Sequence, residues 1–292
     1  MSSADVATVS RGAVGVSPWL RLARVSNTPT VVTDVVAGAM LADAAARAST
    51  IAVVAVAAAL FYTAGMVLND VFDLGVDRVQ RPERPLPSGL VSVRAAIVAT
   101  VVLFAIGEGL LLAVDVVAGL AGLGLIAVIV LYDAWHKGNA LSPLLMGACR
   151  GMVYVVAALA VSGTVSSAVA GAAALLLVYV VGLTQVAKAD GASVASWWPI
   201  AAVLAPVAYW STHLNSSAVA VLLVAFAAFA SYALWLGIVR RAIGPSVGRL
   251  IATIALLDAV AVAAAGGPAV AVAVCLVAFG ATLALQTRIA GT

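Results

Sequence analysis

The sequence from Asn69 to Gly89 reads NDVFDLGVDRVQRPERPLPSG and directly follows an apolar run. On a helix with about 100° per residue, taking Asp70 as zero places Asp77 near ~340°, Asp73 near ~300° and Asn69 near ~260°. Three carboxylates and an amide then share one face, where the carboxylates repel one another unless a cation lies among them. Oxygen ligands suit Mg²⁺, which proteins usually share with substrate phosphates. We therefore expect Asn69, Asp70, Asp73 and Asp77 to be ligands of a magnesium ion at a diphosphate site.

The second half of this stretch carries arginines among prolines. Arg78, Arg81 and Arg84 recur every three residues, and the intervening prolines stiffen the backbone. Because the planar guanidinium matches phosphate oxygens bidentately, we expect Arg81 and Arg84 to bind a diphosphate above the carboxylates. The alternative is an ordinary basic loop beside a membrane. Its position next to the carboxylate face favours the diphosphate-binding interpretation.

The composition places this stretch in a membrane protein. Hydrophobic residues make up 64% of the 292 residues and charged residues only 9%, against about a quarter in soluble domains. Each bilayer crossing needs about 20 apolar residues, so the chain has room for nine or ten spans and for no sizeable soluble domain. A net charge of +3, with arginines beside the spans, favours lipid headgroups or phosphates as partners over nucleic acid. The expected spans are 18–43, 50–70, 92–114, 116–134, 140–162, 166–188, 196–213, 217–239, 247–265 and 268–287.

The basic residues also predict an orientation. Thirteen of the 15 Lys and Arg residues fall at one set of span ends, whereas Arg47 stands at the other set and Arg150 inside a span. The positive-inside rule then places the carboxylate motif on the cytoplasmic face of a cell inner (plasma) membrane. Residues 1–16 are expected to form a flexible cytoplasmic N-terminus, and 17–292 one multi-pass domain.

These motifs resemble the UbiA superfamily of intramembrane prenyltransferases. The superfamily has an Asn-Asp-x-x-Asp-x-x-x-Asp run at a helix end followed by an Arg-Pro-rich loop, as in residues 69–89 here. Weaker similarities extend the match to Arg21, Arg24 and Asn27, to Tyr132 and Lys137, and to Pro143 and Gly147. The resemblance implies an all-α, polytopic transmembrane bundle around a central cavity. It also implies Mg²⁺, a prenyl diphosphate donor, and substrate contacts from Asn27 and Lys137.

The second aspartate pair of that superfamily is incomplete here. The corresponding segment, 182–190, reads GLTQVAKAD, so that Asp190 is the one candidate for a second metal ligand and Val186 stands where its partner would be. One hypothesis is that Lys188 neutralises part of the diphosphate in place of a second metal. The alternative is that Lys188 interacts with the C-terminal end of its own helix.

Residues 132–151 resemble a narrower group, the UbiA-like EboC subgroup. Within this block Arg150 lies about three turns into its span, where an unpaired cation is costly, so we expect it to face the cavity and contact a diphosphate or an aspartate. Tyr154, one turn further along, is a second candidate for the cavity wall.

Together these observations predict a prenyltransferase in which Asp70, Asp73 and Asp77 are catalytic. An isoprenoid group would pass from a prenyl diphosphate to a hydrophobic, aromatic or lipidic acceptor, with metal and cations stabilising the leaving diphosphate. Because the second aspartate pair is degenerate, a membrane carrier or lipid-binding scaffold without turnover is the alternative. A transporter is disfavoured, because a cytoplasmic carboxylate cluster does not resemble a midplane ion site.

Overall fold

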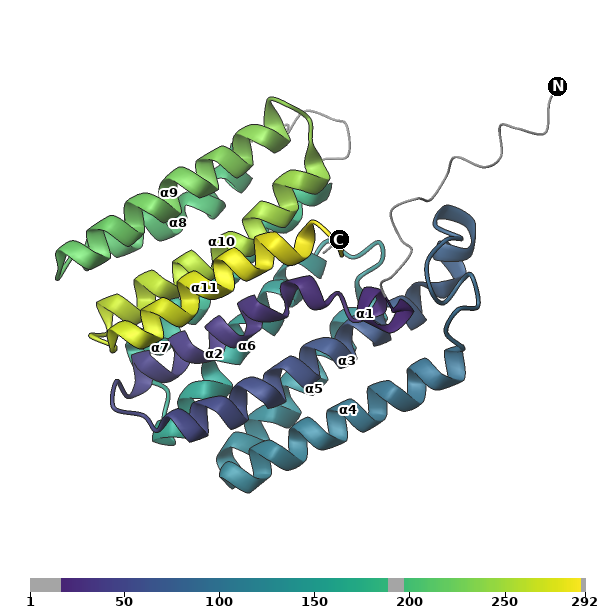
Figure 1. The fold of residues 1–292 in the computed structure, drawn as a ribbon, viewed down its shortest axis with the longest axis horizontal. Coiled ribbons are helices and arrows are strands. Elements are labelled where there is room, and N and C mark those ends of the chain that lie inside the picture. The colour runs from purple at the N-terminus through teal and green to yellow at the C-terminus, as the bar shows by residue number, and fades with distance from the viewer. Residues whose placement is uncertain (1–16, 189–196, 290–292) are drawn as a thin grey trace.

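The computed structural model describes residues 17–188 and 197–289, and within them the chain is helical without strands. The expectations for residues 1–16 and for Asp190 lie outside the described residues. Figure 1 shows the long helices lying side by side as a bundle of rods that crosses the view obliquely. The elements, in chain order, are α1 (Pro18–Leu22), η1 (Val25–Asn27), α2 (Thr28–Ala42), α3 (Ala48–Gln80), α4 (Val93–Val114), α5 (Val116–Trp135), α6 (Ser142–Ser162), α7 (Ser167–Lys188), α8 (Trp198–Ser211), α9 (Ser217–Ile238), α10 (Ile243–Ala264) and α11 (Ala269–Gln286).

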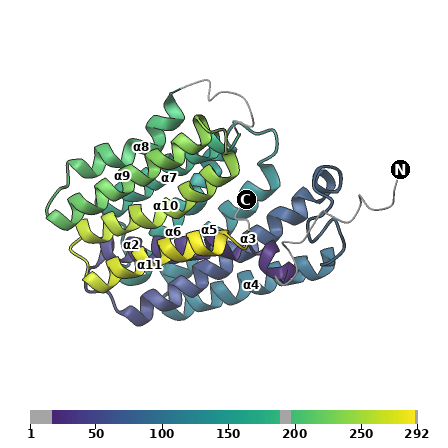
Figure 2. The same cartoon turned by 45° about the horizontal axis from the view of Figure 1, so that its top comes forward.

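The ten helices α2 to α11 correspond one to one with the ten predicted spans. Eight of them are long and apolar enough to cross a membrane, and α2 and α8, with 15 and 14 residues, are the shorter ones. The polytopic all-α bundle is therefore confirmed. The predicted break between the last two spans is also present, because Gly266 takes a positive φ of 72° and Pro268 caps α11. Figure 2 shows α10 and α11 side by side next to α2.

The first predicted span, 18–43, was wrong as a continuous helix. It is divided into α1, η1 and α2, and Arg24 between the first two takes a φ of 45°. A non-glycine residue pays for this left-handed conformation in steric strain, and Pro29 marks a new helix start at the first turn of α2. The break turns the chain at the polar end of the bundle. It thereby brings Arg24 over the end of α3.

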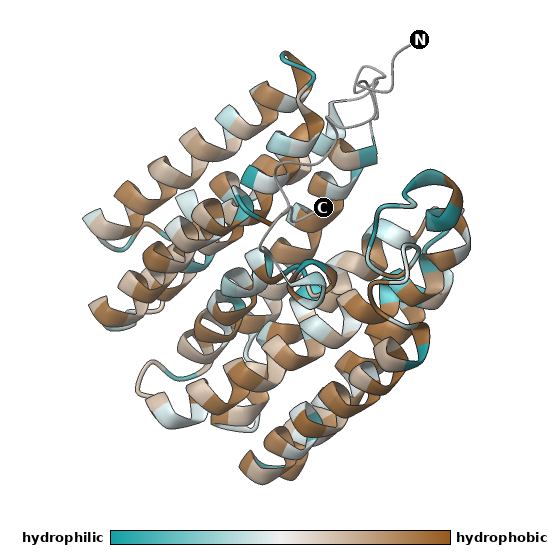
Figure 3. Ribbon diagram, turned by 45° about the vertical axis from the view of Figure 1, so that its right-hand side comes forward, coloured by the Kyte–Doolittle hydropathy of each residue, from teal (hydrophilic) through white to brown (hydrophobic). Residues whose placement is uncertain are grey.

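Polar residues gather at that same end of the bundle. Figure 3 shows mostly hydrophobic helices and a hydrophilic loop after α3, which holds the Arg-Pro segment. Inside the bundle, α10 contacts α2, α7, α9 and α11 and is the most enclosed of the long helices described. The helices α2, α3, α5, α6, α7 and α10 surround the interior in which a cavity lies.

Candidate active site

The carboxylate motif lies on the last three turns of α3, which continues ten residues past the predicted span end at 70. The helix stops at Gln80, because Pro82 disfavours helical backbone at the residue before it. The backbone N–H of Arg81 donates to the carbonyl oxygen of Asp77 at 2.8 Å and closes the last turn. One unbroken helix thus carries Asn69, Asp70, Asp73 and Asp77, as the sequence predicted.

Asp70 and Asp77 share an arginine. The Nη1 atom of Arg84 lies 2.8 Å from Oδ2 of Asp77 and 3.6 Å from Oδ1 of Asp70, and Nη2 of Arg24 lies 2.9 Å from the same Asp70 oxygen. Both carboxylates are buried, whereas the arginine side chains keep 16% and 19% of their surface exposed. The arginines therefore lie between buried negative charge and the opening of the bundle. This is where phosphate oxygens could reach them.

Asp73 pairs with two residues that follow α5. Its Oδ1 lies 2.8 Å from Nζ of Lys137 and 3.2 Å from Nε2 of His136, two residues from the turn after α5. The ring Nδ1 of His136 contacts the backbone carbonyl of Asp133 at 3.0 Å. The predicted substrate-binding residue Lys137 therefore does lie at the carboxylate face. The contact of His136 with Asp73 joins two segments that are distant along the chain, and the sequence motifs did not indicate it.

Asn69 is hydrogen-bonded to an aspartate outside the motif. Its amide Nδ2 donates to Oδ1 of Asp133 on α5 at 3.1 Å. Among the residues that the structure describes, no group of three or more His, Cys, Asp or Glu side chains is arranged as a metal site, and the assignment of Asn69, Asp70, Asp73 and Asp77 as metal ligands stays a prediction. In this structure the carboxylates pair with side-chain cations: Asp70 and Asp77 with Arg84, Asp70 also with Arg24, and Asp73 with Lys137. The amide of Asn69 is held by Asp133.

The residues still fit a divalent cation in two respects. The donors are oxygens, which suit Mg²⁺, and Asn69 keeps its carbonyl oxygen for a ligand because its amide N–H faces Asp133. In addition, one cationic nitrogen of Arg84 already lies within ion-pair distance of Asp70 and Asp77, so these two carboxylates can reach a common positive charge. Asp70 and Asp77 would help to hold Mg²⁺, and the ion would supply positive charge beside Arg84.

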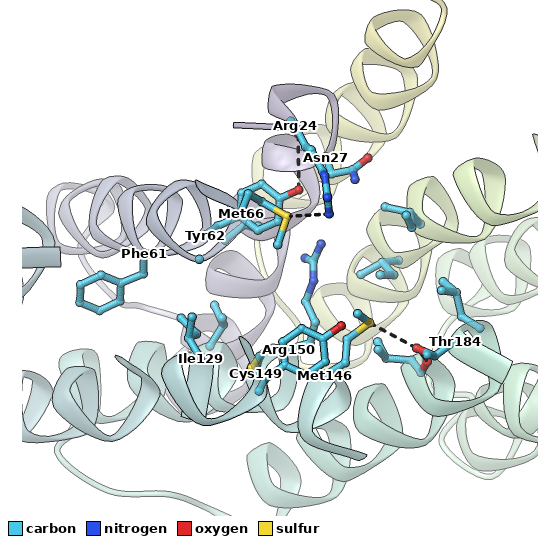
Figure 4. Close-up of a pocket in the computed structure, with 18 of the residues that line it drawn as sticks. Arg24, Asn27, Phe61, Tyr62, Met66, Ile129, Met146, Cys149, Arg150 and Thr184 are labelled. Carbon is cyan, nitrogen blue, oxygen red and sulfur yellow. Dashed lines mark hydrogen bonds between the residues drawn. The ribbon is translucent and has the colours of Figure 1, made fainter. Parts of the chain in front are cut away.

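We call the cluster of Arg24, Asp70, Asp73, Asp77, Arg84, His136 and Lys137 the charged mouth. An apolar cavity of about 300 Å³ lies beneath it. Arg24 and Asp133 belong both to the cavity wall and to the contacts just described, so the mouth and the cavity are contiguous. Figure 4 shows the wall residues on facing helices. Most of the cavity wall is apolar, formed by Val31, Phe61, Gly65, Met66, Leu125, Ile129, Met146, Val153, Val180, Leu183, Ala187, Val247, Ile251 and Ile254.

Two residues that were predicted to contact substrate, Asn27 and Arg150, line the cavity. Asn27 is buried, and its Oδ1 accepts a hydrogen bond from Nε2 of Gln286 at 3.2 Å. Arg150 donates to Oδ2 of Asp34 at 2.6 Å and to Oγ1 of Thr30 at 2.9 Å, which provides the aspartate partner that its burial requires. Figure 4 shows its guanidinium directed toward the side of the cavity where Arg24 lies.

Tyr154, the second candidate for the cavity wall, is not among the residues that line the cavity. Its side chain is fully buried, and its hydroxyl donates to Oδ1 of Asp258 at 2.5 Å. Thr33 donates to the other oxygen of Asp258. The tyrosine therefore ties α6 to α10 within the bundle core, because Asp258 is the polar partner nearest to its hydroxyl.

The remaining predicted residues lie at the polar end. Arg81 is exposed, on the loop that follows α3. Lys188, at the last position of α7, donates from Nζ to Oγ of Ser142 at 2.9 Å, at the first position of α6. It therefore has a structural partner in the described chain and still lies on the same side of the bundle as the mouth.

Comparison with known proteins supports the same fold and family. The solved apo structure of a UbiA homolog from Aeropyrum pernix K1 matches with a TM-score of 0.67 and 20% identity, covering 80% of this chain and 96% of that one. A UbiA homolog from Archaeoglobus fulgidus, solved bound to GPP and Mg²⁺, matches with a TM-score of 0.61 and 16% identity, covering 86% and 98%. These likenesses show the fold.

Curated relatives match over shorter segments. The digeranylgeranylglyceryl phosphate synthase of Methanopyrus kandleri is 36% identical over 138 residues, 45% of this chain and 50% of that protein. The synthase of the same name from Sulfolobus acidocaldarius is 42% identical over 76 residues, 25% and 26%. The chain thus spans between a quarter and a half of the length of these relatives. The model of the UbiA prenyltransferase family matches residues 31–242, more than half of the sequence, and the chain belongs to the UbiA prenyltransferase family.

Proposed function

We propose that residues 17–292 form one intramembrane prenyltransferase domain that moves an isoprenoid group from a prenyl diphosphate to a hydrophobic, aromatic or lipidic acceptor, with Mg²⁺. The observation that carries this proposal is that Arg24 belongs to both the charged mouth and the wall of the apolar cavity. Its guanidinium pairs with Asp70 at the charged mouth, and the same side chain lines the apolar cavity. A molecule with a diphosphate at one end and a hydrocarbon chain at the other fits this arrangement.

The donor-binding roles follow from the ion pairs. Arg84 and Lys137 occupy carboxylates in this structure, and both keep part of their surface exposed, so each can turn toward a phosphate oxygen. Arg81 is exposed on the same loop and adds a third cation, and Lys188 is a fourth candidate. Asp70, Asp73, Asp77 and the carbonyl oxygen of Asn69 would hold Mg²⁺, and Asp190 would add a ligand for a second ion. When bound, Mg²⁺ supplies positive charge that stabilises the leaving diphosphate.

The chemistry divides between the mouth and the cavity. The bond from C1 of the prenyl chain to the diphosphate oxygen breaks, and the electron pair leaves on the diphosphate, whose charge Arg84 and Lys137 stabilise. The allylic carbon then bonds to the acceptor, and the acceptor's proton passes to the released diphosphate. The apolar wall around Phe61 and Ile129 excludes water, which would otherwise capture the allylic cation. Asn27 and Arg150 contact the substrates from the cavity wall.

The names of the relatives support the donor class. The Archaeoglobus fulgidus homolog was solved with GPP and Mg²⁺, and the curated relatives are named for a product that carries two geranylgeranyl groups on glyceryl phosphate. We extend a prenyl diphosphate donor to this chain on that basis. We also propose that the mouth faces the cytoplasm from the plasma membrane, since the basic residues gather at its end of the bundle. The EboC assignment stays a prediction.

The test is Mg²⁺-dependent release of diphosphate from geranylgeranyl diphosphate by the purified chain supplied with an aromatic or a lipidic acceptor, with Asp73→Ala as the inactive control. We expect release by the wild-type protein with Mg²⁺ and none with a chelator. Asp73→Ala should lose turnover, because its carboxylate is in the proposed metal set. If the wild-type protein bound geranylgeranyl diphosphate tightly but released no diphosphate with any acceptor, the carrier function would replace the transferase.

A further inference from the structure

Asp258 is a buried carboxyl group that the proposed function does not use. It lies on α10, and none of its surface is exposed. Its Oδ1 accepts a hydrogen bond from the hydroxyl of Tyr154 at 2.5 Å, and its Oδ2 contacts the hydroxyl of Thr33. The carboxyl group also lies within hydrogen-bonding reach of Asp34 on α2, which is equally buried. Two carboxyl groups therefore meet inside the bundle, out of contact with solvent.

Arg150 is the one cation that the described residues bring to this pair of carboxyl groups. Its Nη1 atom lies 2.6 Å from Oδ2 of Asp34, and no other ion pair among the described residues involves either carboxyl group. The other titratable side chains around the cluster, Tyr62 on α3, Tyr154 on α6 and Cys275 on α11, are neutral in their ordinary state. Two ionised carboxylates beside one guanidinium would leave a net negative charge in the apolar interior, which is costly, whereas one bound proton makes the cluster neutral.

The hydrogen bonds require the same proton. Oδ1 of Asp34 is sealed from solvent and has no hydrogen-bond partner among the described residues, although the carboxyl group of Asp258 lies beside it. A buried acceptor without a donor is costly, so such oxygens in native proteins are normally satisfied. A carboxylate at Asp258 has no proton to offer, whereas a carboxylic acid has one. A proton between the two groups therefore satisfies the oxygen and balances the charge at once.

We propose that Asp258 is a neutral carboxylic acid that donates its proton in a hydrogen bond to Oδ1 of Asp34, which keeps its negative charge for Arg150. The partners assign the proton: Asp34 faces a guanidinium, which favours the charged form, whereas Asp258 faces two hydroxyl groups. Asp258 is then a positioning residue, because it fixes Asp34, and Asp34 in turn fixes the guanidinium of Arg150 at the cavity wall. Neither the donor nor the acceptor of the proposed reaction enters into this arrangement.

Asparagine substitutions distinguish the two carboxyl groups, because an amide imitates the neutral acid and not the carboxylate. In Asp258→Asn the side-chain oxygen can still accept from the hydroxyl of Tyr154. The new NH₂ group can donate to Asp34 and to Thr33, and Thr33 can turn its own proton to a backbone carbonyl oxygen 2.9 Å away. Asp34→Asn instead removes the negative charge that Arg150 faces. The two substitutions are therefore expected to have unequal effects.

The first measurement is unfolding of the full detergent-solubilised chain by SDS, followed by circular dichroism. We expect Asp258→Asn to unfold at the same SDS concentration as the wild-type protein. Asp34→Asn should raise the equilibrium constant of unfolding about tenfold or more, because a charged hydrogen bond to Arg150 becomes a neutral one. Asp258→Leu should unfold at a lower SDS concentration than Asp258→Asn, because it leaves Tyr154 without its acceptor. Equal effects of the two asparagine substitutions, a larger effect of Asp258→Asn, or its failure to fold would overturn the proposal.

The second measurement is infrared spectroscopy, which reads the protonation of Asp258 directly and does not depend on its contribution to packing. A carboxylic acid has a C=O stretching band that is separate from the bands of carboxylates and of the backbone. The difference spectrum between the wild-type protein and Asp258→Asn should contain this acid band. The matched control is Asp115→Asn, which removes an exposed helix cap and should leave the acid band unchanged. Loss of a carboxylate band in Asp258→Asn, with no loss of the acid band, would show that Asp258 is ionised and would overturn the proposal.

Discussion

Removing one partner of the ion pair between Arg150 and Asp34 should strongly destabilise the bundle, because the other charge stays buried without it. Nη1 of Arg150 lies 2.6 Å from Oδ2 of Asp34, which is fully buried, and the arginine side chain is 14% exposed. At an effective dielectric constant of ~20, two unit charges at this distance attract by about 6 kcal/mol, before the cost of removing both from water. Asp34→Leu would leave Arg150 with Thr30 as its hydrogen-bond partner. We expect a loss of about 3–5 kcal/mol in the free energy of unfolding.

A double-mutant cycle separates the pair from other effects of the substitutions. Arg150→Leu alone should also destabilise the bundle, because it leaves the buried carboxylate of Asp34 without its cation. The double variant Asp34→Leu with Arg150→Leu should recover most of the lost free energy of unfolding. The assay is reversible unfolding in mixed detergent and SDS micelles, followed by circular dichroism. The reasoning is refuted if the two single effects add to within about 0.5 kcal/mol in the double variant.

Three further predictions concern packing and the charged mouth. Gly38→Ala should destabilise by about 1–3 kcal/mol, because the new Cβ would lie 2.6 Å from the backbone Cα of Tyr154, whereas Gly75→Ala, with open space around it, should be neutral or stabilising in the same unfolding assay. Arg84→Gln should weaken binding of geranylgeranyl diphosphate about tenfold or more in calorimetry, since it removes a charged donor from the mouth, and unchanged affinity would contradict its role. Lys188→Ala should also lower the affinity for geranylgeranyl diphosphate if Lys188 substitutes for a second metal, and unchanged affinity would leave it a structural residue.

The local features of the site were readable in the sequence. The spacing of Asp70, Asp73 and Asp77 predicts one helix face, and the structure keeps all three on α3. The position of Arg84 near that face also follows from its motif, because its loop directly follows α3. These predictions rest on short sequence distances, where helix periodicity determines the geometry. Lys137 is distant from Asp73 along the chain, and it was placed near this face by the family resemblance alone.

Contacts between distant segments could not be read in the same way. Arg150 and Asp34 are 116 residues apart, and Tyr154 and Asp258 are 104 residues apart. Periodicity says which face of a helix is polar but not which helix packs against it. For the same reason, the sequence did not indicate the hydrogen bond between Asn69 and Asp133, which are 64 residues apart. This hydrogen bond holds the amide of Asn69, a predicted metal ligand, against the aspartate on α5.

The break at Arg24 was missed for a different reason. Hydropathy averages over about 20 residues and treated 18–43 as one span, although Pro18 and Pro29 are both signals of a helix start. Reading those prolines as N-terminal positions would have divided the segment. The left-handed backbone at Arg24 places its side chain between the mouth and the cavity, which sequence patterns did not indicate.

The central claim is that one ligand spans the charged mouth and the apolar cavity, and a structure with a bound donor analogue tests it most directly. The experiment is electron cryomicroscopy of the full chain with Mg²⁺ and the unreactive thiolo analogue of geranylgeranyl diphosphate. We predict density for the diphosphate between Asp70, Asp73 and Arg84, with the hydrocarbon chain continuing between Met66 and Ile129. Density for the analogue elsewhere, or a diphosphate without contact to α3, would contradict the account.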